Sequence, residues 1–260
     1  TVAMGLPFAL EPKRGPVPGR PIRTLADVER LDAQPPPEKF LHIIRLLRRV
    51  KAELAGALPV IVFAGAPFTL ATYCIDTGKD LAATRRFAHA QPAVWQALLD
   101  RLQRATIGFL QALIAEGADA YQLFDSWAGL LERSEYEAWA QPRHQAILRA
   151  VAGVPRILFV KEGPYLDLMT QTGADVISLG TRHDLAQARR DYPRLVFQGN
   201  VDEKILRSGT PQEVTAATNR CVQAGGGQRH IVNLNHGVDR TTPVANFEAY
   251  VRAVKDQKAE

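Results

Sequence analysis

The chain has 260 residues and a formal net charge of +5, and 46% of its residues are hydrophobic while 23% are charged. This is ordinary globular composition, and no stretch approaches the ~20 consecutive apolar residues of a membrane span. The sequence also has no basic stripe with interleaved aromatic residues, so we expect neither membrane insertion nor nucleic-acid binding. Its two cysteines, Cys74 and Cys221, form no CxxC pair. We therefore expect a cytoplasmic protein without a zinc framework.

The first part of the chain predicts little regular structure. The opening ~25 residues are rich in proline and glycine, which indicates an irregular segment and not a separate domain. The chain begins at Thr1 and not at methionine, which favours processing or a fragment. A helix is predicted over residues 37–56. Leu41, Ile44 and Leu47 fall on one of its faces, and we interpret its basic residues as a solvated face.

Six short apolar runs follow, and each precedes a stretch with helical spacing. The apolar runs are residues 59–64, 120–124, 156–160, 174–179, 194–197 and 230–234. The helical stretches lie near residues 91–117, 135–151, 164–172, 183–190, 211–224 and 243–256. This alternation predicts a parallel sheet with right-handed crossovers. Because the runs are apolar almost throughout, we expect strands that are covered on both faces.

Such βα units build either a doubly wound sheet or an eight-stranded barrel. Nearly every run ends in polar residues or glycine, as at Asp125-Ser126 and Asn235-His236, and barrel sites are built from the carboxyl ends of many strands. The sequence has no GxGxxG motif of a dinucleotide-binding sheet. We predict one α/β domain over residues 1–260, a (β/α)8 TIM-type barrel. Its first one or two βα units, about 60 residues for two, are expected to be absent from this chain.

Four motifs stand at or near the ends of these runs. FAGAPFTLATY over residues 63–73 is similar to the FAGAPWTL-x-TY signature of the uroporphyrinogen decarboxylase family. LFDSWAG over 123–129, QGNVD over 198–202 and NLNHG over 233–237 resemble that family's LF-[DE]-S-x-AG, QGN-[LV]-D and NLGHG motifs. The motifs come in the family's order and spacing, so the chain is identified as a member of this family.

The resemblance implies a cytoplasmic, homodimeric carboxy-lyase of haem synthesis. Its substrate would be uroporphyrinogen III, whose four acetate side chains become methyl groups to give coproporphyrinogen III and carbon dioxide. No metal or organic cofactor is implied, because a pyrrole protonated at its α carbon serves as the electron sink. The family's RQAGRY and FSDIL motifs, which carry substrate-binding arginines and an aspartate facing the pyrrole nitrogens, lie upstream of Thr1. We therefore expect an N-terminally truncated chain that lacks them.

The resemblance also implies four site residues. Tyr73 would be catalytic and substrate-binding, next to the reacting acetate or orienting the aspartate, and Ser126 and His236 would hydrogen-bond substrate carboxylates. His236 could also stand as an imidazolium near the polyacid, and Phe63 would offer an apolar surface to the macrocycle. Each has a structural interpretation as well: an anchored helix tyrosine, a helix N-cap, a structural histidine and a core phenylalanine. The four motifs together favour the functional interpretation for Tyr73, Ser126 and His236.

Some strand-end residues stay outside the predicted site. Adjacent strand residues face opposite ways, so only one of Asp125 and Ser126 faces the barrel mouth, and we leave Asp125 out. Lys161 and Glu162 are left out as well.

Two positions depart from the family's pattern. The chain has Leu179-Gly180-Thr181 where the family often has Leu-Asp-Trp, and it has Asn235 where glycine usually precedes the histidine. We expect the loop geometry to differ locally at these two places.

Two other functions remain open from the sequence. A zinc-dependent methylcobamide:coenzyme M methyltransferase on the same barrel would need a histidine and two cysteines as metal ligands, commonly as His-x-Cys at the last strand. Here His236 is followed by Gly237 and Val238. Alternatively the chain is an inactive fragment that lacks the upstream catalytic aspartate and arginines and has at most a binding role. An incomplete barrel also exposes two sheet edges and part of its core, which predicts poor solubility or association.

Overall fold

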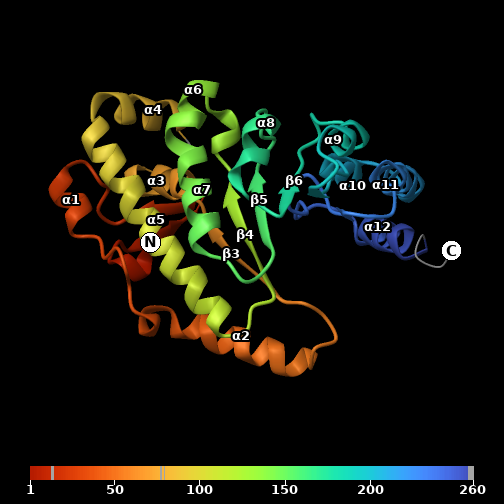
Figure 1. The fold of residues 1–260 in the computed structure, drawn as a ribbon, viewed down its shortest axis with the longest axis horizontal. Helices are drawn as coiled ribbons and strands as arrows, with labels where there is room; N and C mark the ends of the chain where they lie inside the picture. Colours follow the sequence, from red (N-terminus) through yellow and green to blue (C-terminus); the bar gives the residue numbers. More distant parts are fainter. Residues whose placement is uncertain (13–14, 77, 79, 257–260) are drawn as a thin grey trace.

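The computed structural model describes residues 1–12, 15–76, 78 and 80–256, and its centre is a parallel sheet of six strands (Figure 1). The strands are β3 (Ile61–Gly65), β4 (Ala120–Asp125), β5 (Arg156–Val160), β6 (Val176–Ser178), β7 (Val196–Gln198) and β8 (His230–Ile231). Each strand lies at one of the six predicted runs. The predicted α/β fold is therefore confirmed.

The strand order distinguishes between the two predicted architectures. A doubly wound sheet reverses its strand order at a switch point, whereas here every strand from β3 to β7 pairs with its successor in the chain. Gln122 of β4 and Gln198 of β7 meet through their side-chain amides at 3.0 Å, although β5 and β6 lie between them. The sheet therefore curls as a barrel wall does, and the face that carries these glutamines is concave.

Helices cover the convex face of the sheet (Figure 1). Tyr121 and Leu123 of β4, Leu158 of β5 and Phe197 of β7 alternate with concave-face residues, and all four are fully buried. The helices after β3 are α3 (Pro67–Ile75), α4 (Leu81–Ala90), α5 (Pro92–Ala115), α6 (Arg133–Glu135), α7 (Gln141–Ala150), α8 (Leu166–Met169), α9 (Leu185–Asp191), α10 (Glu203–Ser208), α11 (Pro211–Gly225) and α12 (Val244–Asp256). A π-helical turn, Tyr136–Ala140, precedes α7.

Three aromatic rings fix the helix layer behind β3 and β4. Phe68 of α3 and Trp139 of the π-helical turn lie 5.8 and 5.6 Å from Trp95 of α5 between ring centroids, both in edge-on geometry. Phe68 and Trp95 are fully buried, and edge-on ring pairs of this kind stabilise a core beyond the area that they bury.

Burial of the concave face depends on the position of the strand in the sheet. In the central strand β5, Ile157 and Phe159 are buried on this face, as expected. The expectation of two covered faces is wrong for the outer strands: Ile61 and Phe63 of β3 are 48% and 66% exposed, and Ile231 of β8 is 41% exposed. Within the described ranges β3 and β8 each pair with a neighbour on one side only.

The prediction of an irregular N-terminal segment is also wrong. A 3-10 turn (Val2–Met4) leads into an antiparallel hairpin of β1 (Phe8–Glu11) and β2 (Gly15–Pro18). Prolines fit a two-stranded hairpin, because each strand has an unpaired edge on which a missing N–H costs no ladder bond. The short helix α1 (Leu25–Glu29) follows, with a capping box between Thr24 and Asp27.

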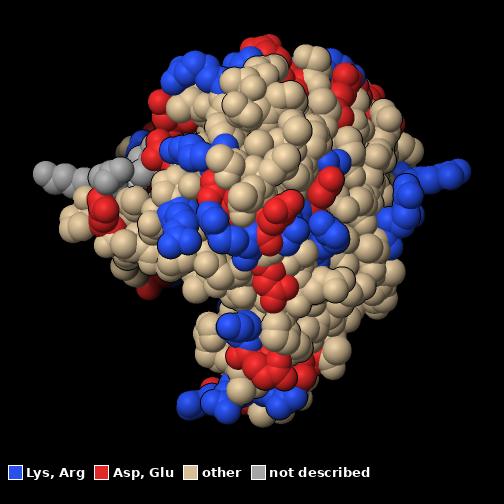
Figure 2. Space-filling view, turned by 90° about the vertical axis from the view of Figure 1, so that its left-hand side faces the viewer, with Lys and Arg blue, Asp and Glu red and all other residues tan. Residues whose placement is uncertain are grey.

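The helix predicted over 37–56 is a 3-10 turn (Pro37–Phe40) followed by α2 (Leu41–Leu54). Ile44 and Leu47 are buried, while Arg48 and Lys51 are paired with Glu116 and Asp119. The basic residues are thus partly matched by acidic ones on this surface. On the face drawn in Figure 2, Lys and Arg are interspersed with Asp and Glu and do not form a single stripe.

Among the described residues, the helices α1, α3, α4 and α10 were not predicted. Seven of the nine residues of α3 are buried, so the helix has no polar face that would reveal its period. In the part of the chain that the structure describes, none of the helices has the length and apolar character needed to cross a bilayer.

Candidate active site

A line of aromatic rings crosses the concave face near the carboxyl ends of the strands. Phe63 of β3 lies 5.6 Å from Phe124 of β4 between ring centroids, and Phe124 lies 5.0 Å from Phe159 of β5. Phe159 lies 6.4 Å from the imidazole of His236, which follows β8. Phe63 and His236 are exposed, so both ends of this ring line are open to solvent. The carboxyl ends of barrel strands are where active sites are found.

The neighbouring half of the same face is polar. Backbone pairing places Phe159 beside Ser178 of β6, and Ser178 beside Gln198 of β7. The amide of Gln198 donates to the Gln122 side-chain oxygen at 3.0 Å and to the Ser178 hydroxyl at 3.3 Å. Near the carboxyl ends of the strands, the concave face is therefore aromatic over β3 to β5, while β6 and β7 add a hydroxyl and an amide.

Tyr73 reaches the loop that follows β4. Its hydroxyl accepts a hydrogen bond from Trp127 Nε1 at 3.3 Å, and Trp127 directly follows Ser126. The tyrosine ring lies against Gly78, where an added Cβ would stand 2.4 Å from Tyr73 Cε1. The structure thus brings Tyr73 and Ser126 to one strand end, while Phe63 and His236 lie at the two ends of the ring line. Strand β4 connects these two pairs of residues: Phe124 of this strand belongs to the ring line, and Ser126 follows the strand directly.

Asp125 belongs to a buried network behind this strand end. Its Oδ1 accepts a hydrogen bond from Thr69 Oγ1 at 2.6 Å, and its Oδ2 lies 2.8 Å from His144 Nε2. The side chains of Asp125 and His144 are both 0% exposed. Thr69 Oγ1 in turn accepts from the backbone N–H of Trp127 at 3.1 Å. Burial first, and then the charge of Asp125, raise the pKa of Tyr136, whose hydroxyl lies 3.4 Å from His144 Nδ1.

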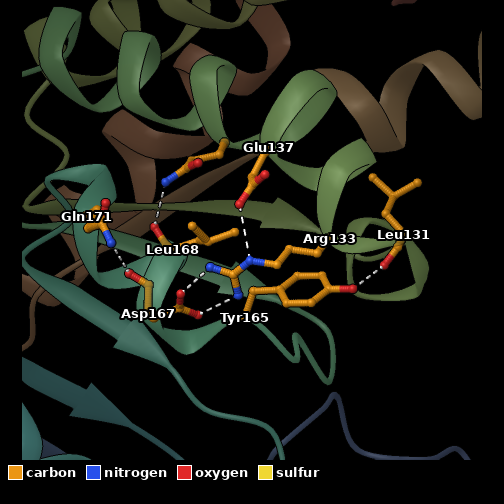
Figure 3. Close-up of polar contacts among 8 residues, drawn as sticks. Leu131, Arg133, Glu137, Tyr165, Asp167, Leu168 and Gln171 are labelled. Atoms are coloured by element: carbon orange, nitrogen blue, oxygen red, sulfur yellow. Dashed lines mark hydrogen bonds and ion pairs between the residues drawn. The ribbon is translucent and has the colours of Figure 1, made fainter.

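A second cluster joins the loop after β4 to the loop after β5 (Figure 3). Arg133 makes two hydrogen bonds to the carboxylate of Asp167 and one of 3.2 Å to Glu137. Its guanidinium lies 5.6 Å from the ring centroid of Tyr165, whose hydroxyl donates to the Leu131 carbonyl at 2.9 Å. The hydrogen bond from Arg133 lowers the pKa of Asp167. Although exposed ion pairs are individually weak, a network of several such contacts ties the two loops together.

Comparison with known proteins identifies the family to which this chain belongs. The family described as Uroporphyrinogen decarboxylase (URO-D) matches residues 1–257. The chain belongs to the uroporphyrinogen decarboxylase family. A relative named uroporphyrinogen decarboxylase from Synechococcus sp. (strain JA-3-3Ab) is 36% identical, over 99% of this chain and 72% of that protein. One from Streptomyces avermitilis is 39% identical, over 99% of this chain and 74% of that protein.

A solved structure has the same fold at much lower sequence identity. A methyltransferase from Methanosarcina mazei superposes with a TM-score of 0.78 and 17% identity, over 99% of this chain and 77% of that one. At this identity the likeness concerns the fold alone. It agrees with the barrel-type strand order described above.

In this member of the uroporphyrinogen decarboxylase family, the QGNVD motif joins three elements. The Asn200 side chain donates 2.9 Å hydrogen bonds to the carbonyls of Gly180 and His183, which follow β6. The backbone N–H of Asn200 donates to Cys221 Sγ, and that thiol donates to the Gly199 carbonyl, both at 3.3 Å. Burial raises the pKa of Cys221. The motif therefore acts here through its backbone and amide, which hold the end of β7 between β6 and α11.

Cys74 lies in another helix than Cys221 of α11, the cysteine that contacts the QGNVD motif. It is fully buried in α3, and desolvation raises its pKa to about 12. Among the residues that the structure describes, no group of three or more histidine, cysteine or acidic side chains is placed to hold a metal ion.

The glycine of the LFDSWAG motif is required by close backbone contact. A Cβ at Gly129 would stand 2.1 Å from the carbonyl oxygen of Lys161, in the loop after β5. We expect Gly129→Ala to destabilise the fold by about 2–3 kcal/mol, because the backbone must move. Gly108 is the matched control: it is exposed in α5 with nothing within 4 Å of an added Cβ. Gly108→Ala should add up to about 1 kcal/mol.

Urea unfolding followed by tryptophan fluorescence measures both changes. Equal effects of the two substitutions would contradict the role given to the contact between Gly129 and Lys161.

Sequence reasoning missed Phe124, Phe159, Gln122 and Gln198, which make up most of the concave site. One signal was available: Gln122 and Phe124 stand two residues apart, and two-residue spacing places side chains on one face of a strand. The pairing of Phe124 with Phe159, and of Ser178 with Gln198, depends on strand register. Register is set by the helices between the strands and cannot be counted from the sequence.

Proposed function

We propose that this chain provides the substrate-binding wall of an enzyme that decarboxylates uroporphyrinogen III, converting its four acetate side chains to methyl groups to give coproporphyrinogen III and four molecules of carbon dioxide. The observation that carries the proposal is the ring line at the carboxyl ends of the strands, in a chain that matches the family over residues 1–257. A large macrocycle of four pyrrole rings needs an apolar wall of this kind, with polar groups at its rim.

Each candidate residue has a defined task in this proposal. Phe63 and the two rings beside it contact the face of the macrocycle, and the exposed imidazole of His236 hydrogen-bonds a substrate carboxylate. Ser126 binds a second carboxylate at the end of β4. The Tyr73 hydroxyl, which accepts from Trp127, donates a hydrogen bond to the reacting acetate and orients it for loss of carbon dioxide.

The chemistry requires protonation of a pyrrole α carbon, after which the electrons of the breaking carbon–carboxylate bond flow into the cationic pyrrole. The exocyclic methylene that remains after loss of carbon dioxide takes up a proton to become the methyl group, and the α carbon gives up its added proton to restore the pyrrole. No metal or organic cofactor is needed for this step. By the resemblance, the arginines and the aspartate that serve proton delivery and charge stabilisation belong to the RQAGRY and FSDIL motifs. We therefore assign binding and orientation to the residues described here, and proton transfer to those motifs.

We also propose that the enzyme is a cytoplasmic homodimer and that residues 1–260 form one domain. A single large core cluster supports the second point, since it runs from Met4 in the N-terminal turn to Tyr250 in α12. Residues 257–260 of the predicted domain lie outside the described residues. Light scattering of the purified protein measures the oligomeric state, and a monomer at assay concentration would contradict the dimer.

The deciding experiment is anaerobic conversion of uroporphyrinogen III, with products separated by carboxylate number. The 260-residue chain is assayed beside a version preceded by the RQAGRY and FSDIL motifs. We expect coproporphyrinogen from the extended version and little or none from the shorter one. If both are folded and neither forms it, the proposed reaction is wrong. Metal analysis provides a second test, because stoichiometric zinc in the purified protein would support the methyltransferase alternative.

A further inference from the structure

The two places where the chain departs from the family's motifs meet at one carboxylate. Glu162, in the loop after β5, accepts hydrogen bonds from the backbone N–H and the hydroxyl of Thr181, at 3.0 and 3.2 Å. It also accepts from the side-chain amide of Asn235 at 2.9 Å. Gly180 lies against it so closely that an added Cβ would stand 2.8 Å from Glu162 Cα. Glu162 thus connects the strand ends of β5 and β6 with the loop after β8.

Asn235 is held on two sides and leads directly into His236. Its amide donates to Glu162, and its side-chain oxygen accepts from the backbone N–H of Glu203 at 2.8 Å. Its own backbone N–H donates to the Val201 carbonyl at 2.9 Å. Asn235 is 6% exposed whereas His236, the next residue, is exposed. The position from which the imidazole projects is therefore set by the contacts of Asn235.

We propose that Glu162 is a positioning residue for His236, which it fixes through Asn235 so that the imidazole lies at the end of the ring line. This inference rests on the proposed function, because the substrate-binding task of His236 is part of that proposal. Its geometric part, the control of the imidazole position by Glu162, is independent of any reaction.

We expect the shape of Glu162 to matter more than its charge for this role. The backbone N–H of Arg182 also donates to this carboxylate. Of the three contacts described above, those from Thr181 N and Asn235 Nδ2 end on the same oxygen, Oε1. The third comes from a hydroxyl to Oε2, and a hydroxyl can accept as well as donate. A glutamine can therefore keep all three bonds, with its oxygen at the Oε1 position and its amide donating to the Thr181 hydroxyl. An alanine can keep none of them.

The structure offers a matched control at the opposite ends of the same two strands. Asp175 accepts hydrogen bonds from the backbone N–H of Arg156 at 2.9 Å and from its guanidinium at 2.8 and 2.9 Å. It therefore bridges β5 and β6 with a carboxylate at their amino ends, away from the ring line. Asp175→Ala removes a comparable bridge without touching the loop of His236.

The experiment uses the enzyme that carries the upstream motifs. The imidazole signal of His236 is recorded by NMR and assigned with a His236→Ala variant. KM and kcat for uroporphyrinogen III are measured on the same proteins. We expect Glu162→Ala to shift or broaden the His236 signal and to raise KM about tenfold, the loss of one hydrogen bond to a charged group, with a smaller change in kcat. Glu162→Gln should restore the signal and most of the affinity. Asp175→Ala should change neither.

The outcomes separate the two proposals. An unchanged His236 signal in Glu162→Ala overturns the positioning role, as does a Glu162→Gln variant that behaves like Glu162→Ala or an Asp175→Ala variant that moves the signal equally. If the signal moves as expected but no variant, nor the parent, decarboxylates the substrate, the positioning role holds and the proposed reaction is wrong.

Discussion

Asp125→Ala is expected to lower the free energy of unfolding by about 3–5 kcal/mol, because two buried hydrogen-bond donors lose their acceptor, each at a cost of roughly 1–3 kcal/mol. Asp125 and His144 are both fully buried at 2.8 Å, and the carboxylate also accepts from Thr69 at 2.6 Å. Its removal leaves an imidazole and a hydroxyl in the core without their acceptor. Because Thr69 also receives the Trp127 N–H, the loop that carries Ser126 should loosen as well.

Asp125→Asn provides the control for size. Its oxygen can still accept from Thr69 and its amide can donate to His144, so the cost should be well below that of alanine. Urea unfolding at neutral pH measures all variants, and a double-mutant cycle with His144→Ala gives the coupling energy. A loss below about 1 kcal/mol for Asp125→Ala, or no coupling with His144, would show that the network is not a source of stability.

The second large effect concerns turnover. Tyr73→Phe should lower kcat by about 10–100-fold, since a hydrogen bond to a charged group contributes roughly 1.5–3 kcal/mol. Stability should change by less than about 1.5 kcal/mol, because the side chain is only half-buried and loses one 3.3 Å hydrogen bond from Trp127.

Tyr165→Phe is the matched control for this measurement. Tyr165 also loses one hydroxyl hydrogen bond, to the Leu131 carbonyl, and it also borders the loop after β4. It lies in the Arg133 cluster, to which the proposed function gives no substrate contact. Anaerobic turnover of the enzyme with the upstream motifs is compared for the two variants. Equal turnover for parent and Tyr73→Phe would remove Tyr73 from the site.

The sheet could be predicted from the sequence, while much of the surrounding structure could not. Buried strands such as β4 and β5 are apolar runs between polar stretches, and that contrast is visible residue by residue. The helix α3 lacks such a contrast because it is buried nearly all round, and the β1–β2 hairpin is hidden by prolines that usually indicate loops. Local composition therefore predicts a helix or strand only when its two faces differ in polarity, or when the residues at its ends differ in polarity from the element itself.

The candidate site follows the same logic. Motif resemblance gave Tyr73, Ser126, Phe63 and His236. The structure places Tyr73 and Ser126 near the end of β4, and Phe63 and His236 at the two ends of the ring line. Period-two alternation correctly separates Asp125, which faces the helices, from the mouth. The part played by Glu162 could not be predicted, because its partners Thr181 and Asn235 are distant in sequence and meet only through the curl of the sheet.

The division of the concave face into an aromatic half and a polar half has a consequence for substrate handling. The four acetates of the proposed substrate are spread around its ring, whereas the wall that would bind them is aromatic on one side and polar on the other. Only one acetate can then stand beside Tyr73 in any one pose. In the proposed reaction, each of the four decarboxylations thus requires a new orientation of the macrocycle. If the wall bound the macrocycle too tightly for it to reorient, the reaction would stop after the first decarboxylation.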